Sequence, residues 1–484
     1  MKSFYIDDIT WNDLNMEDVL SRIDSSSSSV GKEYIRKSLR TLEFDPETLK
    51  ERGKRADYFE DNKEEASRLK KIFSNLGKTK KVSFYDYIFR LKELKNGGNA
   101  LHYVLIILLL AAIGLIFVKP AWGVVALVVM ICVNVILYFR KRADVEGYFL
   151  SLKYLVAMIS TALAVLKKVK LDDPAFLKIK EDLKNSAEEL KSLKRGSWLI
   201  TNSVSGSLID VIMDYVRMIF HVDLIRFNQM KKKALGHEKE INSLYDALGE
   251  LELALSVCAY RESLPYYCEP EFEDSLKIEA EDIIHPLVEE AVPNSIKTQR
   301  SVLFTGSNAS GKSTFLKTLA LNQIFAQTIY TVLARSYATS FYKVLSSMAL
   351  SDNILGKESY FVVEIKSLKR IFDELSDTPV LCFIDEVLRG TNTKERIAAS
   401  SQILKKLSSE NALVFAATHD IELTDILKDD MTNMHFSESV KDTEVIFDYK
   451  LKEGPADSRN AIKLLEIYGF DKEIIDNALK LCLP

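Results

Sequence analysis

Residues 306–313 carry the feature that most limits how this chain can fold. They read Gly-Ser-Asn-Ala-Ser-Gly-Lys-Ser and fit the pattern G-x-x-x-x-G-K-[ST]. The apolar run Ser301–Thr305 before them is typical of a strand, and Thr314–Gln327 after them is predicted to be a helix. Glycine-rich backbone between a strand and a helix N-terminus wraps closely around phosphate groups. The motif therefore predicts a P-loop nucleotide-binding domain.

The positions of this loop have expected parts in binding ATP and Mg²⁺. Lys312 should reach the β- and γ-phosphates, and the Ser313 hydroxyl should bind the metal. Backbone N–H groups of the loop and of the first helical turn should face the phosphates. The expected nucleotide-binding residues of this segment are Gly306, Ser307, Asn308, Ala309, Ser310, Gly311, Lys312, Ser313 and Thr314.

A second apolar run, Val380–Ile384, leads directly into Asp385 and Glu386. An apolar strand that ends in paired carboxylates suits a Walker B site. Asp385 is predicted to hold Mg²⁺ through water, whereas Glu386 is predicted to orient or deprotonate the attacking water.

A third apolar run, Ala412–Ala416, is followed by His419. The carboxyl ends of strands form the ligand-binding rim of a doubly wound sheet. We therefore expect His419 to hydrogen-bond the γ-phosphate or the attacking water, so that Lys312, Glu386 and His419 are the predicted catalytic residues.

Two adjacent stretches, Leu101–Val118 and Ala121–Phe139, contain no Asp, Glu, Lys or Arg. As helices each would extend roughly 27–29 Å at about 1.5 Å per residue, which is close to a bilayer core of about 30 Å. A hairpin buried inside a soluble protein is the alternative, but His102 and Asn134 are too isolated to form the polar face of such a helix. The basic residues on both flanks favour a two-span hairpin in the cytoplasmic membrane, with the N-terminus and the P-loop domain in the cytoplasm; they are Lys92, Lys95, Arg140, Lys141 and Arg142.

The composition of the 484 residues is 47% hydrophobic and 28% charged, with a net charge of -4. This balance is that of folded domains, and any contact with nucleic acid would need a local basic patch such as Lys231–Lys233. The serine run Ser25–Ser29 is predicted to cap a helix, and the five cysteines form no C-x-x-C pair that would indicate a metal site. The predicted organisation is a helical core in residues 1–100, the membrane hairpin in 101–142, the rest of the core in 143–265, and an α/β ATPase domain with a mostly parallel sheet in 266–484.

Three segments together resemble the ATPase domain of the MutS mismatch-repair family. Asp385–Thr393 resembles the family's Walker B and D-loop, and Thr305–Thr314 resembles its Walker A. Ser359–Glu364 is similar to its signature stretch, and Ile284–Val288 to its nucleotide-proximal lead-in. The resemblance covers about residues 280–480 and, more weakly, residues 5–45.

The resemblance implies an ABC-type homodimer in which two domains enclose ATP. Ser359 would then face the γ-phosphate held by the other subunit, while Arg389 and Gly390 would cross the interface. His285 would lie beside the adenine. The chain starts directly in the helical core and leaves no room for the family's mismatch-reading module, and the hairpin is foreign to the mismatch-repair members.

Two functional hypotheses follow. In the first, a membrane-held ATPase of the MutS type couples ATP to the binding of mismatched or structured DNA. In the second, it is an ATP-driven conformational switch that acts on a protein partner without nucleic acid. Salt-dependent DNA binding distinguishes the first from the second.

Overall fold

The computed structural model describes residues 3–79, 83–94, 98–200, 208–307, 310–348, 360–389, 391–441, 444–456 and 469–482. By internal contacts the chain divides into two compact units. Unit 1 consists of Met1–Ile23, Arg36–Lys54 and Ala259–Pro484, and unit 2 consists of Asp24–Ile35 and Arg55–Cys258. Each unit is therefore assembled from segments that are not consecutive in the sequence.

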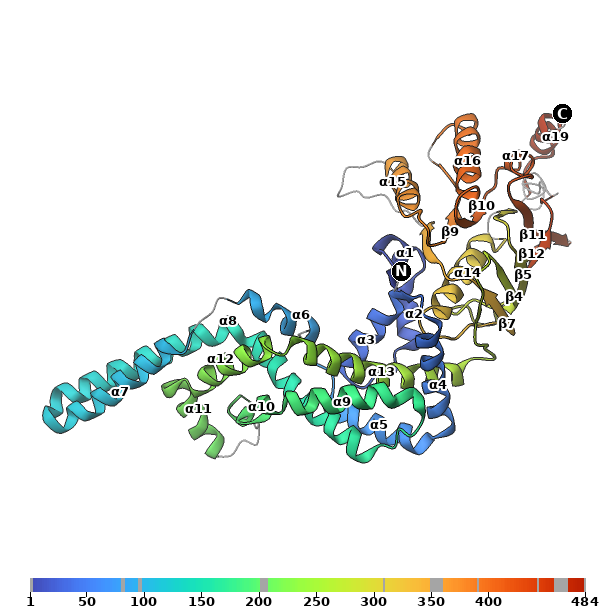
Figure 1. The fold of residues 1–484 in the computed structure, drawn as a ribbon. Coiled ribbons are helices and arrows are strands. Elements are labelled where there is room, and N and C mark those ends of the chain that lie inside the picture. The colour runs from blue at the N-terminus through green and yellow to red at the C-terminus, as the bar shows by residue number, and fades with distance from the viewer. Residues whose placement is uncertain are drawn as a thin grey trace. The chain divides into compact units, whose positions relative to one another are not determined.

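The main sheet of unit 1 has six strands in the order β12-β11-β6-β10-β9-β8 (Figure 1). All neighbouring pairs are parallel except β11 with β12, which confirms the predicted mostly parallel sheet. The central strands are buried on both faces, as parallel strands covered by helices are. The strands are β6 (Val302–Thr305), β8 (Lys343–Ser347), β9 (Val380–Asp385), β10 (Ala412–Ala417), β11 (Thr432–Lys441) and β12 (Glu444–Glu453).

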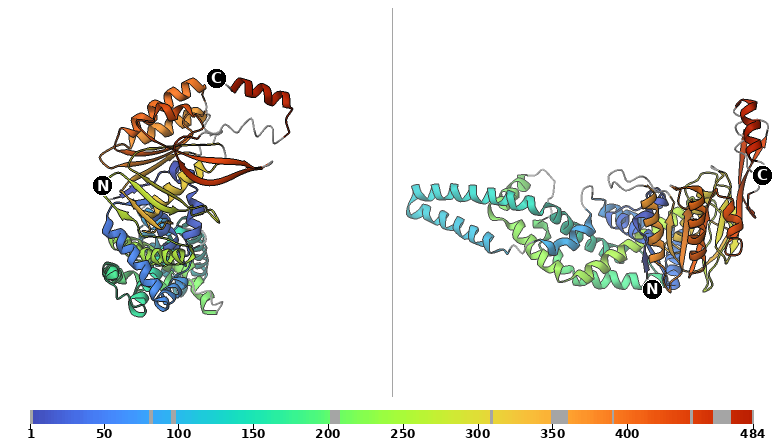
Figure 2. Two further views of the ribbon diagram at one scale, coloured as in Figure 1. Left: turned by 90° about the vertical axis from the view of Figure 1, so that its right-hand side faces the viewer. Right: turned by 90° about the horizontal axis from the view of Figure 1, so that it is seen from above.

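Helices cover both faces of this sheet. Helix α14 (Lys312–Ala326) lies on one face, while α15 (Tyr360–Asp373) and α16 (Thr393–Ser408) lie on the other (Figures 1 and 2). This layering makes the domain an α/β fold, with a mostly parallel sheet between helices on its two faces. The predicted helix after the P-loop begins two residues earlier than expected, at Lys312.

Segments from the start of the chain complete unit 1. Residues 1–100 were predicted to be helical, but β1 (Ser3–Tyr5) and β2 (Thr41–Glu43) form a short antiparallel ribbon. Helix α1 (Asp8–Asp13) packs along the edge strand β8, where an Asp13 carboxylate oxygen accepts hydrogen bonds from the Ser346 hydroxyl at 2.7 Å and from Met348 N at 2.9 Å. Covering an edge strand in this way removes a surface that would otherwise pair with another chain.

A second, four-stranded sheet of unit 1 has the order β3-β7-β4-β5. Strand β4 pairs antiparallel with both of its neighbours. The remaining strands and helices of unit 1 are α2 (Met16–Ile23), β3 (Glu271–Phe272), β4 (Ile278–Ile283), β5 (Asn294–Thr298), β7 (Ser336–Thr339), α17 (Glu422–Ile426) and α19 (Lys472–Cys482).

Unit 2 is helical over its described residues. The apolar stripe predicted on α13 (Glu238–Ser263) is buried, with Leu244, Leu248 and Leu251 fully shielded from solvent. The other helices are α3 (Ser29–Leu39), α4 (Pro46–Asp61), α5 (Lys63–Leu76), α6 (Phe84–Phe89), α7 (Ala100–Val118), α8 (Pro120–Lys168), α9 (Leu177–Glu189), α10 (Lys191–Lys194), α11 (Leu208–Phe220) and α12 (Val222–Leu235). The chain passes from one unit to the other within α3, α4 and α13.

The serine run caps a helix, as predicted. The Ser28 hydroxyl accepts a hydrogen bond from Gly31 N at 3.1 Å, in the geometry of an N-cap residue at the start of α3. The buried carboxylate of Glu252, from α13, accepts hydrogen bonds from Ser27 N at 2.7 Å and from Ser28 N at 3.1 Å. The backbone N–H groups of the serine run therefore link the start of α3 to α13 by hydrogen bonds.

The two charge-free stretches form antiparallel helices, α7 and α8, joined at Lys119 and Pro120. Both are long and apolar enough to span a bilayer. In the most apolar 18-residue window of each helix, only 22% of α7 and 17% of α8 is buried. The second stretch was expected to end at Phe139, but α8 continues through the charged residues to Lys168 and has 49 residues. The apolar hairpin thus consists of α7 and the first part of the much longer helix α8 (Figure 1).

The two isolated polar residues of the hairpin have partners. The His102 Nδ1 atom lies 2.9 Å from Nδ1 of His221, and the Asn134 side chain donates to the Ile219 carbonyl at 2.9 Å. Nε2 of His221 lies 2.9 Å from the carbonyl oxygen of Asn134. Both polar side chains therefore bond to residues at the junction of α11 and α12. They serve that local contact and do not form part of a continuous polar face of the hairpin.

Candidate nucleotide-binding site

Two glycines shape the loop between β6 and α14. Gly306 has φ 142° and Gly311 has φ 108°, values that side-chain-bearing residues rarely adopt. A Cβ atom on Gly306 would come within 2.5 Å of the Phe436 carbonyl oxygen, so backbone of β11 closes against the loop. The sequence places glycine where both the conformation and the close approach require it.

The Lys312 ammonium points back into its own loop. Its Nζ atom donates to the Gly306 carbonyl at 2.8 Å and to the Ser307 carbonyl at 2.7 Å. Burial lowers the pKa of Lys312, although the charges of Asp385 and Glu386 oppose that effect. A buried cation that faces two carboxylates is suited to exchange these loop carbonyls for phosphate oxygens.

Asp385, the last residue of β9, lies beside the start of α14. Burial raises the pKa of its carboxyl group, and a hydrogen bond from the Ser313 hydroxyl acts in the opposite direction. A hydroxyl and a carboxylate are oxygen ligands of the kind that Mg²⁺ takes from proteins while it keeps several waters. This pair therefore fits Mg²⁺, with Ser313 and Asp385 as the residues that would hold it.

Glu386 begins the turn that follows β9. It has φ 58°, its backbone N–H donates to the Ala417 carbonyl at 2.9 Å, and its carboxylate pairs with the Arg389 guanidinium. Burial favours the neutral form of Glu386, but the hydrogen bond and charge of Arg389 prevail and lower its pKa. Glu386 is thus held as a carboxylate at the rim of the sheet.

His419 lies at the end of the neighbouring strand β10. Its Nδ1 atom is 3.6 Å from Oε1 of Glu386, and its Nε2 atom is 3.8 Å from Oδ1 of Asp420. Asp420 in turn receives two hydrogen bonds from Arg396, at 2.8 and 2.6 Å. Glu386 and His419 therefore follow the ends of β9 and β10, and Lys312 begins α14 after the loop that leaves β6; β6, β10 and β9 are consecutive in the sheet.

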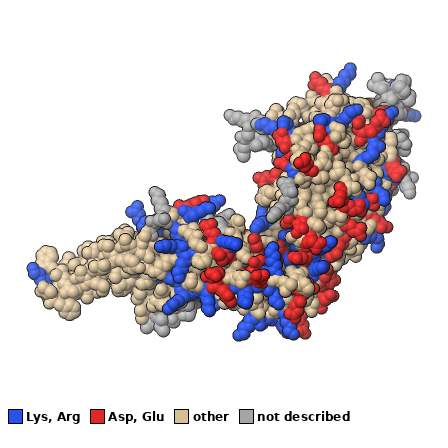
Figure 3. All heavy atoms as spheres, in the orientation of Figure 1, with Lys and Arg blue, Asp and Glu red and all other residues tan. Residues whose placement is uncertain are grey.

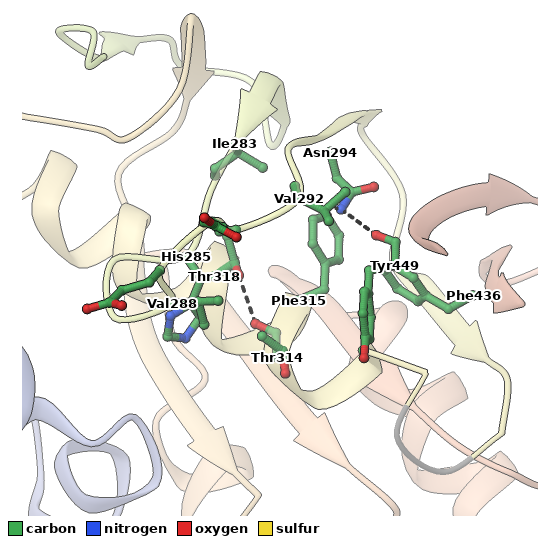
Figure 4. A pocket seen from close by; sticks show the side chains of 14 residues that line it. Ile283, His285, Val288, Val292, Asn294, Thr314, Phe315, Thr318, Phe436 and Tyr449 are labelled. Atoms are coloured by element: carbon green, nitrogen blue, oxygen red, sulfur yellow. Dashed lines mark hydrogen bonds between the residues drawn. The ribbon is translucent and has the colours of Figure 1, made fainter. Parts of the chain in front are cut away.

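Two adjoining pockets open around this rim. The first, of about 470 Å³, is lined by Ser310, Gly311, Lys312, Ser313, Thr314, Glu386, Arg389 and Tyr449. The second, of about 460 Å³, contains the apolar side chains of Ile283, Val288, Phe315 and Phe436 (Figure 4). Gly311, Thr314 and Tyr449 belong to both. A polar pocket with a lysine thus continues into an apolar one, which matches the phosphates and base of a nucleotide.

His285 lines the apolar pocket, as Figure 4 shows. Its Nδ1 atom accepts a hydrogen bond from Leu287 N at 3.1 Å. Burial, with a smaller contribution from Lys317, lowers the pKa of His285 to about 4, so the ring is neutral at physiological pH. A neutral ring in an apolar pocket is suited to pack against a nucleotide base.

The MutS domain V family model matches residues 302–483, the segment that holds this loop, both strand ends and the pocket wall at Tyr449. Residues 302–483 therefore belong to the MutS domain V family. It is 28% identical over 285 residues to the DNA mismatch repair protein MutS of Leptospira interrogans, covering 56% of this chain and 33% of the relative. It is 30% identical over 303 residues to the human MutS protein homolog 4 (58% and 32%) and 30% over 259 residues to MutS of Thermus aquaticus (52% and 31%). The chain spans about a third of the length of these curated relatives.

Most residues predicted for the MutS-type site converge on the two pockets. The polar pocket is lined by Ser310, Gly311, Lys312, Ser313, Thr314 and Glu386, and His285 lines the apolar one, whereas Gly306, Ser307 and Asp385 line neither. His419 lies beside Glu386 without lining either. The predictions for Asn308, Ala309, Ser359 and Gly390 lie outside the described residues.

Three contacts of this MutS domain were not anticipated from the sequence. The Ser307 hydroxyl donates to Glu438 at 2.8 Å, and the Asn294 side chain donates to the Tyr449 carbonyl at 3.0 Å. The buried Glu364 carboxylate accepts a hydrogen bond from Leu388 N in the turn after Glu386. No local signal marks these pairs, because each joins residues at least 24 positions apart.

Proposed function

We propose that this protein binds ATP with Mg²⁺ and hydrolyses it to ADP and phosphate. The observation that carries the proposal is the continuity of the two pockets at Gly311, Thr314 and Tyr449. One pocket offers Lys312 and backbone N–H groups to phosphates, and the other offers apolar walls and a neutral histidine to a base. The match to MutS domain V supports the same assignment.

The residues of the site divide the chemistry among them. Lys312 leaves its loop carbonyls and binds the β- and γ-phosphates. When bound, Mg²⁺ held by Ser313 and Asp385 supplies positive charge that neutralises the developing charge on the phosphates. Glu386 orients the attacking water and accepts its proton, and His419 hydrogen-bonds the γ-phosphate or that water.

We further propose a homodimer that forms through the ATPase domains. In that assembly Ser359 faces the γ-phosphate held by the partner subunit, and Arg389 and Gly390 cross the interface. When the partner subunit approaches, Arg389 can contact that subunit instead of pairing with Glu386. Release of Glu386 from Arg389 would then accompany the closure of two subunits around ATP.

The hairpin of α7 and α8 is proposed to anchor the protein in the cytoplasmic membrane, with the ATPase domain in the cytoplasm. The support is that a core helix would be mostly buried, whereas only about a fifth of each apolar window is buried. Exposed side chains include Ile107 at 64%, Phe117 at 85% and Trp122 at 71%. Such a surface on a two-helix hairpin is suited to lipid rather than to water.

We propose that the ATPase cycle is coupled to mismatched or structured DNA, as the similarity to DNA mismatch repair proteins suggests. The test is ATP hydrolysis by the full chain in lipid nanodiscs at low salt, with and without duplex, mismatched and branched DNA. Lys312→Ala should remove nucleotide binding and turnover. A change in turnover with one DNA form supports the DNA-coupled function. Turnover that no DNA form alters favours the alternative, a conformational switch that acts on a protein partner.

A further inference from the structure

Helix α11 presents an apolar face that nothing in the described part of unit 2 covers. Val211, Ile212 and Tyr215 are exposed by 51%, 54% and 59%. Tyr215 is four residues after Val211 and three after Ile212, so the three side chains lie on one side of the helix. Asp214, between them in sequence, pairs with Arg217 at 2.7 Å. The helix is thus amphipathic, with its apolar side turned outward.

Hydrogen bonds fix where α11 lies along the hairpin. The carbonyl of Ile219, in its last turn, accepts from the Asn134 side chain at 2.9 Å, and His221 directly after it contacts Asn134 and His102. Asn134 lies five residues before Phe139, the end of the charge-free stretch, which is about 7.5 Å along α8. The end of α11 is therefore held close to the level at which the apolar surface of the hairpin gives way to charged residues.

The direction of α11 differs from that of the hairpin. Figures 1 and 2 show α11 running across the axis of α7 and α8 rather than along it. If the hairpin spans a bilayer, a helix that crosses it at this level lies in the plane of the membrane surface. Amphipathic helices in that plane bury their apolar face to about 5–10 Å at the boundary of headgroups and acyl chains.

Positive charge surrounds this level of unit 2. Arg140 and Lys141, directly after the charge-free stretch of α8, are exposed. Figure 3 shows lysine and arginine side chains gathered where the uncharged hairpin meets the rest of unit 2. Basic residues beside a membrane span attract the anionic lipids of the cytoplasmic leaflet. The positive charge and the apolar stripe of α11 thus both suit the surface of a membrane that contains anionic lipids.

We propose that α11 is an interfacial helix, and that Val211, Ile212 and Tyr215 insert into the surface of an anionic phospholipid membrane while Arg140 and Lys141 contact its headgroups. This proposal rests on the proposed membrane hairpin and adds a second, peripheral contact to it. The surface would fix the orientation of unit 2 relative to the membrane, because two helices alone leave rotation about the hairpin axis free.

Tryptophan fluorescence in the full chain tests the proposal. The chain has three tryptophans, of which Trp11 is buried in unit 1, Trp122 is at the tip of the hairpin and Trp198 is in unit 2. In a Trp122→Phe, Trp198→Phe background, Tyr215→Trp places a reporter on the stripe. Leu177→Trp in the same background is the matched control, since Leu177 is equally exposed but begins α9, beyond the far end of α8. A Trp198→Phe variant that keeps Trp122 reports the hairpin.

Each protein is reconstituted into vesicles of phosphatidylcholine and phosphatidylglycerol that carry dibrominated acyl chains. We expect quenching and a blue shift for Tyr215→Trp, no quenching for Leu177→Trp, and quenching of Trp122. Without phosphatidylglycerol, quenching of Tyr215→Trp should weaken while that of Trp122 persists. A quenched Trp122 with an unquenched Tyr215→Trp overturns the interfacial helix and leaves the hairpin intact. An unquenched Trp122 overturns the membrane anchor and the interfacial helix together.

Discussion

The Nδ1 atom of His419 lies 3.6 Å from Oε1 of Glu386, across the carboxyl ends of two neighbouring parallel strands. The two side chains come from β10 and β9, and the backbone N–H of Glu386 is bonded to the Ala417 carbonyl two residues before His419. Their separation is therefore set by the register of the sheet. An acid and a histidine held this close can act on one water molecule, with Glu386 as base and His419 as its hydrogen-bonding partner.

Replacing Glu386 with Gln should separate nucleotide binding from hydrolysis. The amide keeps the size of the side chain but cannot accept a proton, so turnover should fall by about 10²- to 10⁴-fold. Binding should persist, because Lys312 and the loop are unchanged. Single-turnover hydrolysis and binding of a fluorescent ATP analogue measure the two effects. Turnover within a few-fold of the natural protein would remove Glu386 from the role of general base.

Replacing Arg389 with Ala should move the acidic limb of the rate profile to higher pH. Arg389 lowers the pKa of Glu386 against the effect of burial, so its removal raises that pKa. A base that is protonated at higher pH is inactive over a wider acidic range. The pH dependence of kcat/KM, which reports the free enzyme, tests this, with Arg389→Lys as the control that retains the charge. Coincident profiles for Arg389→Ala and Arg389→Lys would contradict the assignment.

Replacing Gly306 with Ala should destroy nucleotide binding. The new Cβ atom would meet the Phe436 carbonyl oxygen at 2.5 Å, and backbone cannot move aside as a side chain can. Gly454→Ala is the matched control, since Gly454 also has a positive φ, 84°, but nothing lies within 4 Å of its Cβ position. That change should cost only about 1–2 kcal/mol of conformational strain. Equal losses of ATP-analogue binding in the two variants would show that strain, rather than the clash, determines the effect.

Replacing Glu364 with Ala should loosen the turn after Glu386. The Leu388 N–H would lose its acceptor in a buried place, which costs about 1–3 kcal/mol. Glu364→Gln keeps an acceptor oxygen and should retain most of the turnover that Glu364→Ala loses. Thermal unfolding and steady-state hydrolysis measure the two effects. If Ala and Gln reduce turnover alike, the carboxylate itself is needed and the hydrogen bond to Leu388 does not explain its role.

The parts of the fold that the sequence predicts are those with strong local patterns. Strand β10 is apolar at every position and the P-loop has a fixed spacing, so both could be located before the structure. The length of α8 could not, because Arg140, Lys141 and Arg142 end the apolar run without ending the helix. Arginine and lysine have good helix propensity, so the helical backbone continues through them. Hydropathy marks only where the apolar surface of the helix ends.

The packing of the chain's start against strand β8 of the same unit was also beyond sequence reasoning. Asp13 and Ser346 are 333 residues apart and meet only because α1 covers the edge strand β8. The same holds for Asn134 of the hairpin, whose partner is a backbone carbonyl on α11. Such pairs carry no periodicity or motif, and the tertiary fold alone brings them together.

Replacing Glu252 with Gln should remove part of the pH dependence of unit 2 stability. Burial, opposed by hydrogen bonds from Ser28 and its neighbours, raises the pKa of Glu252 above its unfolded value. A carboxyl group with a raised folded pKa stabilises the fold below the unfolded pKa of about 4.3, and this contribution is lost as pH rises through the folded pKa. Gln cannot ionise and should keep the contribution at neutral pH, with Oε1 still accepting from Ser27 N and Ser28 N.

Urea-dependent proteolysis of the full chain in nanodiscs, at a series of pH values from about 4 upward, measures this difference. The unfolding midpoint of the natural protein should fall relative to that of Glu252→Gln as pH rises, so that the two curves separate toward neutral pH. Glu252→Ala is the control for loss of the acceptor: it leaves the buried Ser28 N–H unbonded and should lower stability by about 1–3 kcal/mol at every pH. Parallel curves for the natural protein and Glu252→Gln would mean that Glu252 binds its proton equally in the folded and unfolded states, and that burial does not raise its folded pKa.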